Sequence, residues 1–217
     1  MNTLSSPCVV HVLDRLFAES DASEPAMHAA MAGTDVPVMI SSRAGYREFY
    51  GLLKGIPLPV SRETGALLYM FVRATRAQSV LEFGTSFGVS TIYLAAALRD
   101  NGGGRVITTE FETSKVERAR KNLTEAGLID LVEIREGDAL ETLARDPPET
   151  VDLVLLDGAK ALYADVLALV ESRMRPGSLV LADDARFCAE FVNRMRAATD
   201  RYLSAPLAGD LELAMRL

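Results

Sequence analysis

Three aspartates and a lysine are the residues of this chain best placed to do chemistry. Asp157 and Lys160 stand in Asp157-Gly-Ala-Lys160, directly after an apolar run, and Asp183 and Asp184 follow the next such run. If the two runs are neighbouring parallel strands, their carboxyl ends meet at the sheet edge where open α/β folds bind ligands. Carboxylate oxygens are hard ligands, so these residues predict a Mg²⁺ site rather than a zinc or copper site.

The same four residues also allow a metal-free interpretation. Asp184 can cap a helix expected to begin near Arg186, and Asp157 can simply contact a ligand hydroxyl. Lys160 is a candidate general base if burial and its neighbours lower its pKa, and otherwise it forms an ordinary salt bridge. The sequence leaves both interpretations open.

A glycine turn predicts where a cofactor binds. The apolar run 78–83 leads into Gly84-Thr-Ser-Phe-Gly88, and a helix is expected to open near Gly88. Gly84 permits a sharp turn and the close approach of a ligand, and amides at the start of a helix suit an anionic group. The spacing matches neither the G-x-G-x-x-G pattern of dinucleotide-binding proteins nor a P-loop. A purely structural turn is the alternative.

Two further acids end the next two apolar runs. In a doubly wound sheet an acid at the position of Glu110 can accept both hydroxyls of a ribose, although a solvated carboxylate before a helix is the alternative. Asp138 and Ala139 follow the third run, where a nucleoside base would lie, and Asp138 also suits the cap of a helix. Together they predict a ligand that contains a nucleoside.

The elements that must position these residues follow from the alternation of two kinds of segment. Runs rich in Val, Ile and Leu alternate with segments of helical apolar spacing, which predicts a doubly wound α/β fold with a mostly parallel sheet. Strands are expected at 78–83, 105–109, 131–134, 151–156, 178–182, 202–203 and 211–217, and helices at 113–126, 162–174 and 186–198. Turns are expected at Arg175-Pro-Gly177 and Gly209-Asp210.

The first sixty residues have a helical pattern and end in the proline-containing loop Ile56-Pro-Leu-Pro59. Alone they would make a marginal domain. We therefore expect residues 1–60 to form a helical cap within the same domain, concerned with the substrate and with dimer contacts. Residues 61–217 are then expected to form the cofactor-binding domain.

Composition excludes several classes of protein. The 217 residues are 49% hydrophobic and 24% charged, which is typical of a globular chain, and the net charge is −7. That charge disfavours nucleic acid and anionic membranes as partners, and no segment approaches the ~20 apolar residues of a membrane helix. The two cysteines and two histidines form no zinc motif. We expect a cytoplasmic protein that acts on a small molecule.

Five segments together resemble the cation-dependent O-methyltransferases, the family of catechol O-methyltransferase and caffeoyl-CoA O-methyltransferase. The similarity extends over residues 60–217, and the motifs occur in the family's order and spacing. They are Val80–Thr91, Glu110, Glu136–Ala139, Leu156–Lys160 and Leu181–Asp184. The resemblance implies a seven-stranded Rossmann-like class I fold that binds S-adenosylmethionine, and a homodimer as in many relatives.

The resemblance also implies a role for each residue. The cofactor would contact Glu82, Gly84, Ser86 and Ser90 at its methionine end, Glu110 at the ribose, Asp138 and Ala139 at the adenine, and Asp157. Mg²⁺ would be held by Asp157, Asp183 and Asp184, and Lys160, with Asp157, would be catalytic. The implied reaction is methyl transfer to one of two neighbouring hydroxyls on a small aromatic acceptor, with Lys160 as the base and Mg²⁺ lowering the pKa of those hydroxyls.

Two departures from the family pattern affect this assignment. Asp184 stands where the family usually has Asn, and Ala185–Asp210 is short for a segment that normally contacts the substrate. A metal-independent methyltransferase on the same fold and a catalytically silent S-adenosylmethionine-binding protein are therefore the alternatives. A nicotinamide oxidoreductase is disfavoured by the glycine spacing.

Overall fold

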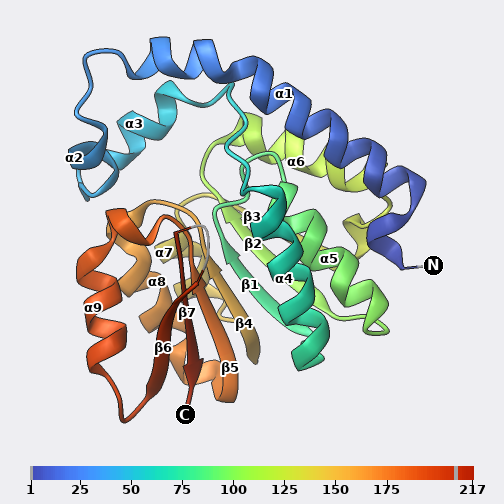
Figure 1. Ribbon diagram of the computed structural model, residues 1–217, viewed down its shortest axis with the longest axis vertical. Helices are drawn as coiled ribbons and strands as arrows, with labels where there is room; N and C mark the ends of the chain where they lie inside the picture. Colours follow the sequence, from blue (N-terminus) through green and yellow to red (C-terminus); the bar gives the residue numbers. More distant parts are fainter. Residues whose placement is uncertain (1, 208–209) are drawn as a thin grey trace.

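The computed structural model describes residues 2–207 and 210–217 and confirms the predicted α/β fold (Figure 1). Its seven-stranded sheet has the order β3-β2-β1-β4-β5-β7-β6. The pairs formed by β1 to β5 are parallel, whereas β7 runs antiparallel to both β5 and β6. The strands are β1 Ser79–Phe83, β2 Arg105–Glu110, β3 Val132–Glu136, β4 Val151–Leu156, β5 Met174–Ala182, β6 Tyr202–Leu207 and β7 Leu211–Arg216.

Helices cover both faces of the sheet because the inner strands alternate apolar side chains between two clusters. Val80, Leu153 and Leu181 point to the side of α1, α4, α5 and α6, whereas Leu81 and Val154 point to that of α7, α8 and α9. The helices are α1 Pro7–Met31, α2 Val36–Ile40, α3 Tyr46–Leu52, α4 Arg62–Thr75, α5 Val89–Asp100, α6 Thr113–Glu125, α7 Ala139–Arg145, α8 Tyr163–Val170 and α9 Ala189–Ala197.

The predicted helix over 162–174 and the turn after it are corrected by the structure. Helix α8 stops at Val170, a 3₁₀ turn covers Glu171–Arg173, and Arg175-Pro-Gly177 belongs to β5. The pairing of β4 with β5 shifts register here, because the proline and glycine form an exposed bulge instead of a turn that ends the strand. The turn expected at Gly209-Asp210 lies partly outside the described residues.

The N-terminal helices lie over the carboxyl ends of the strands (Figure 1). Helix α1 packs through Val12 and Leu16 into the cluster that also contains α4 and α5. Helices α2 and α3 form a smaller apolar cluster around Ile40, Phe49 and Leu53. This position is the one expected of a cap, and the division at residue 60 stays a prediction. Within the described part of the chain, no helix is both long and apolar enough to cross a membrane.

Candidate functional site

The carboxyl ends of the central strands open into a cavity of about 520 Å³ beneath the N-terminal helices. Strand and loop residues form its floor, and side chains from α1, α2 and α3 form its roof. The structure brings most of the predicted site residues together in this one cavity. Those in its wall are Gly84, Ser86, Glu110, Asp138, Ala139, Asp157, Lys160, Asp183 and Asp184.

Glu82 and Ser90 are the two predicted cofactor residues that lie beneath the cavity and not in its wall. Glu82 is fully buried, and its Oε2 accepts hydrogen bonds from the hydroxyls of Thr91 (2.5 Å) and Thr108 (2.6 Å). Its Oε1 has no partner among the described residues. Burial raises the pKa of Glu82 to about 7, against the opposing effect of hydrogen bonds from Ser90, Thr108 and Thr91. Glu82 and Ser90 are therefore both buried under the glycine turn, and Thr91 and Thr108 hold the carboxyl in place.

Gly84 is needed for contact between two loops. Its φ is +105°, and a Cβ there would lie 2.6 Å from the carbonyl oxygen of Asp157. The neighbour that requires glycine here is the chain after β4, which holds the ends of β1 and β4 together, and the close approach of a ligand to Gly84 stays a prediction. Ser86 joins this turn to the cap, because its hydroxyl accepts a hydrogen bond of 3.1 Å from the amide of Leu58.

Glu110 is held in place by backbone amides on both of its oxygens. Oε2 accepts from the amide of Ser86 and Oε1 from that of Glu112, each at 3.0 Å. Burial nevertheless raises the pKa of this carboxyl, with the backbone hydrogen bonds and Lys115 acting in the opposite direction. An oriented, buried carboxylate in the wall of a cavity can accept hydrogen bonds from hydroxyls, which is the chemistry predicted for a ribose.

Asp138 fulfils the structural role predicted for it. Its Oδ1 accepts from the amide of Leu140 at 2.8 Å and caps α7, and its Oδ2 pairs with Arg47. Tyr46 lies on the same side and packs edge-on against Phe111, with 6.2 Å between ring centroids. Both rings line the cavity next to Ala139 and give it an apolar wall beside the capped aspartate.

Lys160 lies between two of the aspartates. Its Nζ is 3.0 Å from Oδ2 of Asp184 and 3.4 Å from Oδ1 of Asp157, and the residue is only 6% exposed. Burial alone lowers the pKa of Lys160, but the surrounding acidic groups, Tyr163 and Asp157 foremost, outweigh it and hold this pKa well above its ordinary value. In this arrangement Lys160 is an ammonium in a buried salt bridge, and not a lysine whose pKa is lowered for proton abstraction.

Asp184 does not cap the following helix through its side chain, so that alternative is contradicted. Its φ is +54°, in the left-handed region where Asn and Asp are the side chains best tolerated. This backbone geometry explains why Asp can stand where the family pattern has Asn. The carboxylate is directed to Lys160 instead of to backbone amides.

The carboxylate oxygens of Asp157, Asp183 and Asp184 are ligands of the kind that a hard divalent cation prefers. The ammonium of Lys160 would compete with such a cation for Asp184. Burial and then Asp184 raise the pKa of Asp183 to about 6, and burial raises that of Asp157, although the nearby ammonium of Lys160 opposes both shifts. Across residues 2–207 and 210–217, however, no three acidic, histidine or cysteine side chains converge as a metal-binding group. A cation at the three aspartates requires Lys160 to release Asp184.

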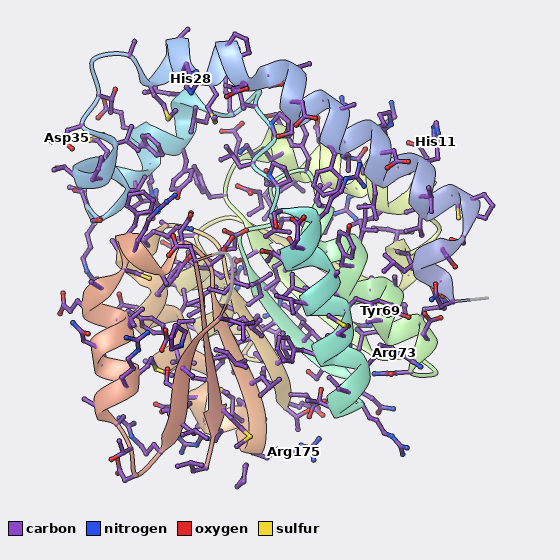
Figure 2. The ribbon with its side chains drawn as sticks, viewed as in Figure 1. His11, His28, Asp35, Tyr69, Arg73 and Arg175 are labelled. Carbon is purple, nitrogen blue, oxygen red and sulfur yellow. The ribbon has the colours of Figure 1, made fainter. Side chains whose placement is uncertain are left out.

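The chain's two histidines, His11 and His28, both lie on α1 (Figure 2). Neither lines the cavity. The histidines therefore offer no base beside the aspartates, and the catalytic role of Lys160 stays a prediction.

Several residues of the cavity wall were missed by the sequence analysis. Phe111 and Lys115 follow Glu110 closely along the chain, so their proximity to that acid was a usable signal. The residues from the roof had no local signal, because their position depends on how the N-terminal helices pack on the sheet. These include Met31, Ile40, Tyr46, Phe49, Tyr50 and Leu53.

The fold and the wall of the cavity define a class I methyltransferase-like protein. A family model described as a methyltransferase domain matches residues 81–185. The chain is 35% identical over 134 residues to a catechol O-methyltransferase of Niastella koreensis, covering 60% of each protein. It is 32% identical over 161 residues to a catechol O-methyltransferase of Mycobacterium tuberculosis, covering 74% of this chain and 65% of that one.

A solved structure agrees with these sequence matches. The O-methyltransferase TomG of Streptomyces achromogenes, in complex with SAM, is 28% identical and superposes with a TM-score of 0.65 over 90% of this chain and 96% of that chain. Residues 81–185 therefore match a methyltransferase domain, and the predicted resemblance to class I O-methyltransferases is confirmed. The alignments span less than two thirds of the length of these two curated relatives.

Proposed function

We propose that this protein is an S-adenosylmethionine-dependent O-methyltransferase that acts on a small hydroxylated acceptor. The observation that carries the proposal is that one cavity contains both the amide-held Glu110 and the cluster of Asp157, Lys160, Asp183 and Asp184. A nucleoside-binding acid and a proton-handling cluster in the same cavity are what methyl transfer from a nucleoside cofactor to a hydroxyl requires. The SAM-bound relative supports the choice of cofactor.

We expect one part of the cavity to bind the cofactor and another part to bind the acceptor. S-adenosylmethionine would supply, when bound, a methyl group on a sulfonium sulfur: the acceptor oxygen bonds to the methyl carbon while the bond from that carbon to sulfur breaks, and S-adenosylhomocysteine leaves as a neutral thioether. Glu110 would accept the ribose hydroxyls, while Asp138 and Ala139 would border the adenine. Asp157 would orient the acceptor hydroxyl and take its proton, the ammonium of Lys160 would stabilise the resulting oxygen anion, and the roof would exclude water from the reacting atoms.

The finer proposal is a catechol-like acceptor with two neighbouring hydroxyls. The roof over the aspartates is apolar and partly aromatic, with Ile40, Phe49, Leu53 and Phe187 lining it, which suits a flat ring. The hydroxyls of that ring would meet the polar floor formed by Asp157 and the residues beside it. The names of the two curated relatives support this class of acceptor.

A divalent cation, Mg²⁺ first, belongs to the same proposal. Asp157, Asp183 and Asp184 would hold it, and its charge would stabilise an ionised acceptor oxygen. All three aspartates line the same cavity and offer the carboxylate oxygens that Mg²⁺ prefers, which supports this choice. A cytoplasmic homodimer without nucleic-acid or membrane contacts completes the proposal, and light scattering tests the dimer.

A metal-independent methyltransferase is the second candidate, and one observation favours it. The ammonium of Lys160 already lies 3.0 Å from Asp184 and places a positive charge where a cation would otherwise sit. If this salt bridge persists during turnover, Lys160 serves as the electrostatic group in place of the metal.

Methyl transfer from labelled S-adenosylmethionine to a panel of catechols, with Mg²⁺ and with EDTA, tests these proposals. Lys160→Met is compared with Lys54→Met, which removes an exposed lysine of the cap. Turnover that requires Mg²⁺ and is lost in Lys160→Met supports the metal-assisted enzyme. Turnover unaffected by EDTA favours the second candidate. Absence of S-adenosylhomocysteine binding would refute both.

A further inference from the structure

Lys115 is a buried cation in the wall of the cavity without a partner in the described chain. It lies in the first turn of α6, is 3% exposed and lines the cavity beside Glu110 and Glu112. Among residues 2–207 and 210–217 its ammonium makes no hydrogen bond, and no carboxylate lies within salt-bridge distance. Only longer-range attraction to Glu110, Glu112 and Asp157 opposes its burial.

An ammonium in this position needs an acceptor from outside the chain. Most of the side chain is removed from solvent and its Nζ keeps access only to the cavity, so this largely desolvated charge is stabilised by an acceptor that enters there. The nearby acids are engaged with backbone amides, since Glu110 accepts from Ser86 and from Glu112, and Glu112 caps α6 through Ser114. The open side of Lys115 is the cavity, and the acceptor must therefore belong to what fills the cavity.

The chemistry of Glu110 identifies the group that Lys115 can serve. A carboxylate can only accept hydrogen bonds, so the two hydroxyls of a ribose diol would donate to it, and the lone pairs of both hydroxyl oxygens would remain unsatisfied. Lys115, five residues further along the chain and in the same wall, offers three donors. We propose that Lys115 binds the ribose of the nucleoside cofactor: its ammonium donates hydrogen bonds to the oxygens of the same hydroxyls that donate to Glu110. This inference rests on the proposed function.

Calorimetric titration of nucleoside ligands into the full chain tests the assignment. S-adenosylhomocysteine is compared with 5′-methylthioadenosine, which keeps the ribose and lacks the amino-acid carboxylate, and with the 2′-deoxy and 3′-deoxy forms of the latter. Lys115→Met is compared with Lys121→Met, a matched control on the exposed face of the same helix. Lys115→Arg retains the charge and donors.

Lys115→Met is expected to weaken the binding of S-adenosylhomocysteine and of 5′-methylthioadenosine to the same extent, by about 10- to 100-fold. Such a loss of affinity is typical of a lost hydrogen bond to a charged group. The affinity difference between 5′-methylthioadenosine and its deoxy forms should shrink in this variant, a change that mere loss of stability does not produce. Lys121→Met should bind like the unmodified protein, and Lys115→Arg should recover part of the affinity.

Three results would overturn the inference. If Lys115→Met weakens the binding of S-adenosylhomocysteine but leaves the binding of 5′-methylthioadenosine unchanged, Lys115 contacts the amino-acid carboxylate and not the ribose. Unchanged affinity for both ligands, or an undiminished discrimination against the deoxy forms, would remove Lys115 from the ribose. If the unmodified protein binds none of these ligands, the proposed function itself is wrong, and the role of Lys115 is refuted with it.

Discussion

Replacing Glu82 by Gln should change how the stability of this protein depends on pH. Glu82 is fully buried beneath the glycine turn, and burial raises its pKa from 4.5 to about 7. Below pH 4.5 the carboxyl is protonated in the folded and the unfolded chain and has no effect on the pH dependence. Between pH 4.5 and 7 the unfolded chain loses this proton first, so the folded state binds more protons and its stability falls as the pH rises.

The size of the effect follows from the shift in pKa. Each unit corresponds to about 1.4 kcal/mol, so the rise from 4.5 to about 7 predicts a loss of about 3 kcal/mol above pH 7. Glu82→Gln keeps an oxygen that can accept from Thr91 and Thr108 but cannot ionise. The variant should therefore gain about 3 kcal/mol relative to the unmodified protein as the pH rises from 4.5 to 8, whatever its absolute stability.

Urea denaturation at several values of pH measures this difference directly. Glu149→Gln, which removes an exposed carboxylate, is the matched control and should follow the unmodified protein throughout. Parallel curves for Glu82→Gln and the unmodified protein would refute the reasoning, because they would mean that Glu82 ionises in the folded chain as easily as in the unfolded one.

Three further predictions concern the cavity. Gly84→Ala should lower the melting temperature and should weaken the binding of S-adenosylhomocysteine at least 10-fold, because the new Cβ would lie 2.6 Å from the backbone of Asp157. Calorimetry should show a much smaller effect for Gly102→Ala, because Gly102 also has a positive φ but has open space around it. Lys160→Met should lower turnover at least 100-fold with little change in cofactor affinity, because it removes the positive charge beside the acceptor oxygen, and a normal rate would exclude a catalytic role for Lys160. Asp184→Asn should keep the fold and raise the Mg²⁺ concentration for half-maximal turnover about 10-fold, since it removes one ligand charge; an unchanged concentration would exclude Asp184 as a ligand.

The sequence by itself determined the fold and the location of the site at one edge of the sheet. Apolar runs of strand length alternating with helical segments allow few topologies other than a doubly wound sheet, and parallel strands must end at one edge. Acids that directly follow such runs, as Glu110, Asp157 and Asp183 do, are therefore placed at that edge by local pattern and topology alone. Proline and glycine at 175–177 misled the prediction, because a bulge within a strand and a turn that ends one have the same local composition.

Only the tertiary structure decided which side chains contact one another at that edge of the sheet. Lys160 approaches Asp184 across 24 positions of sequence, and its pKa rises instead of falling because the packing of two loops sets that distance. Glu82 lies under the cavity and Lys115 in its wall for the same reason: burial and partners depend on contacts between distant segments. Local sequence specifies which way a chain turns, whereas the charge state and partners of a buried group depend on every element packed around it.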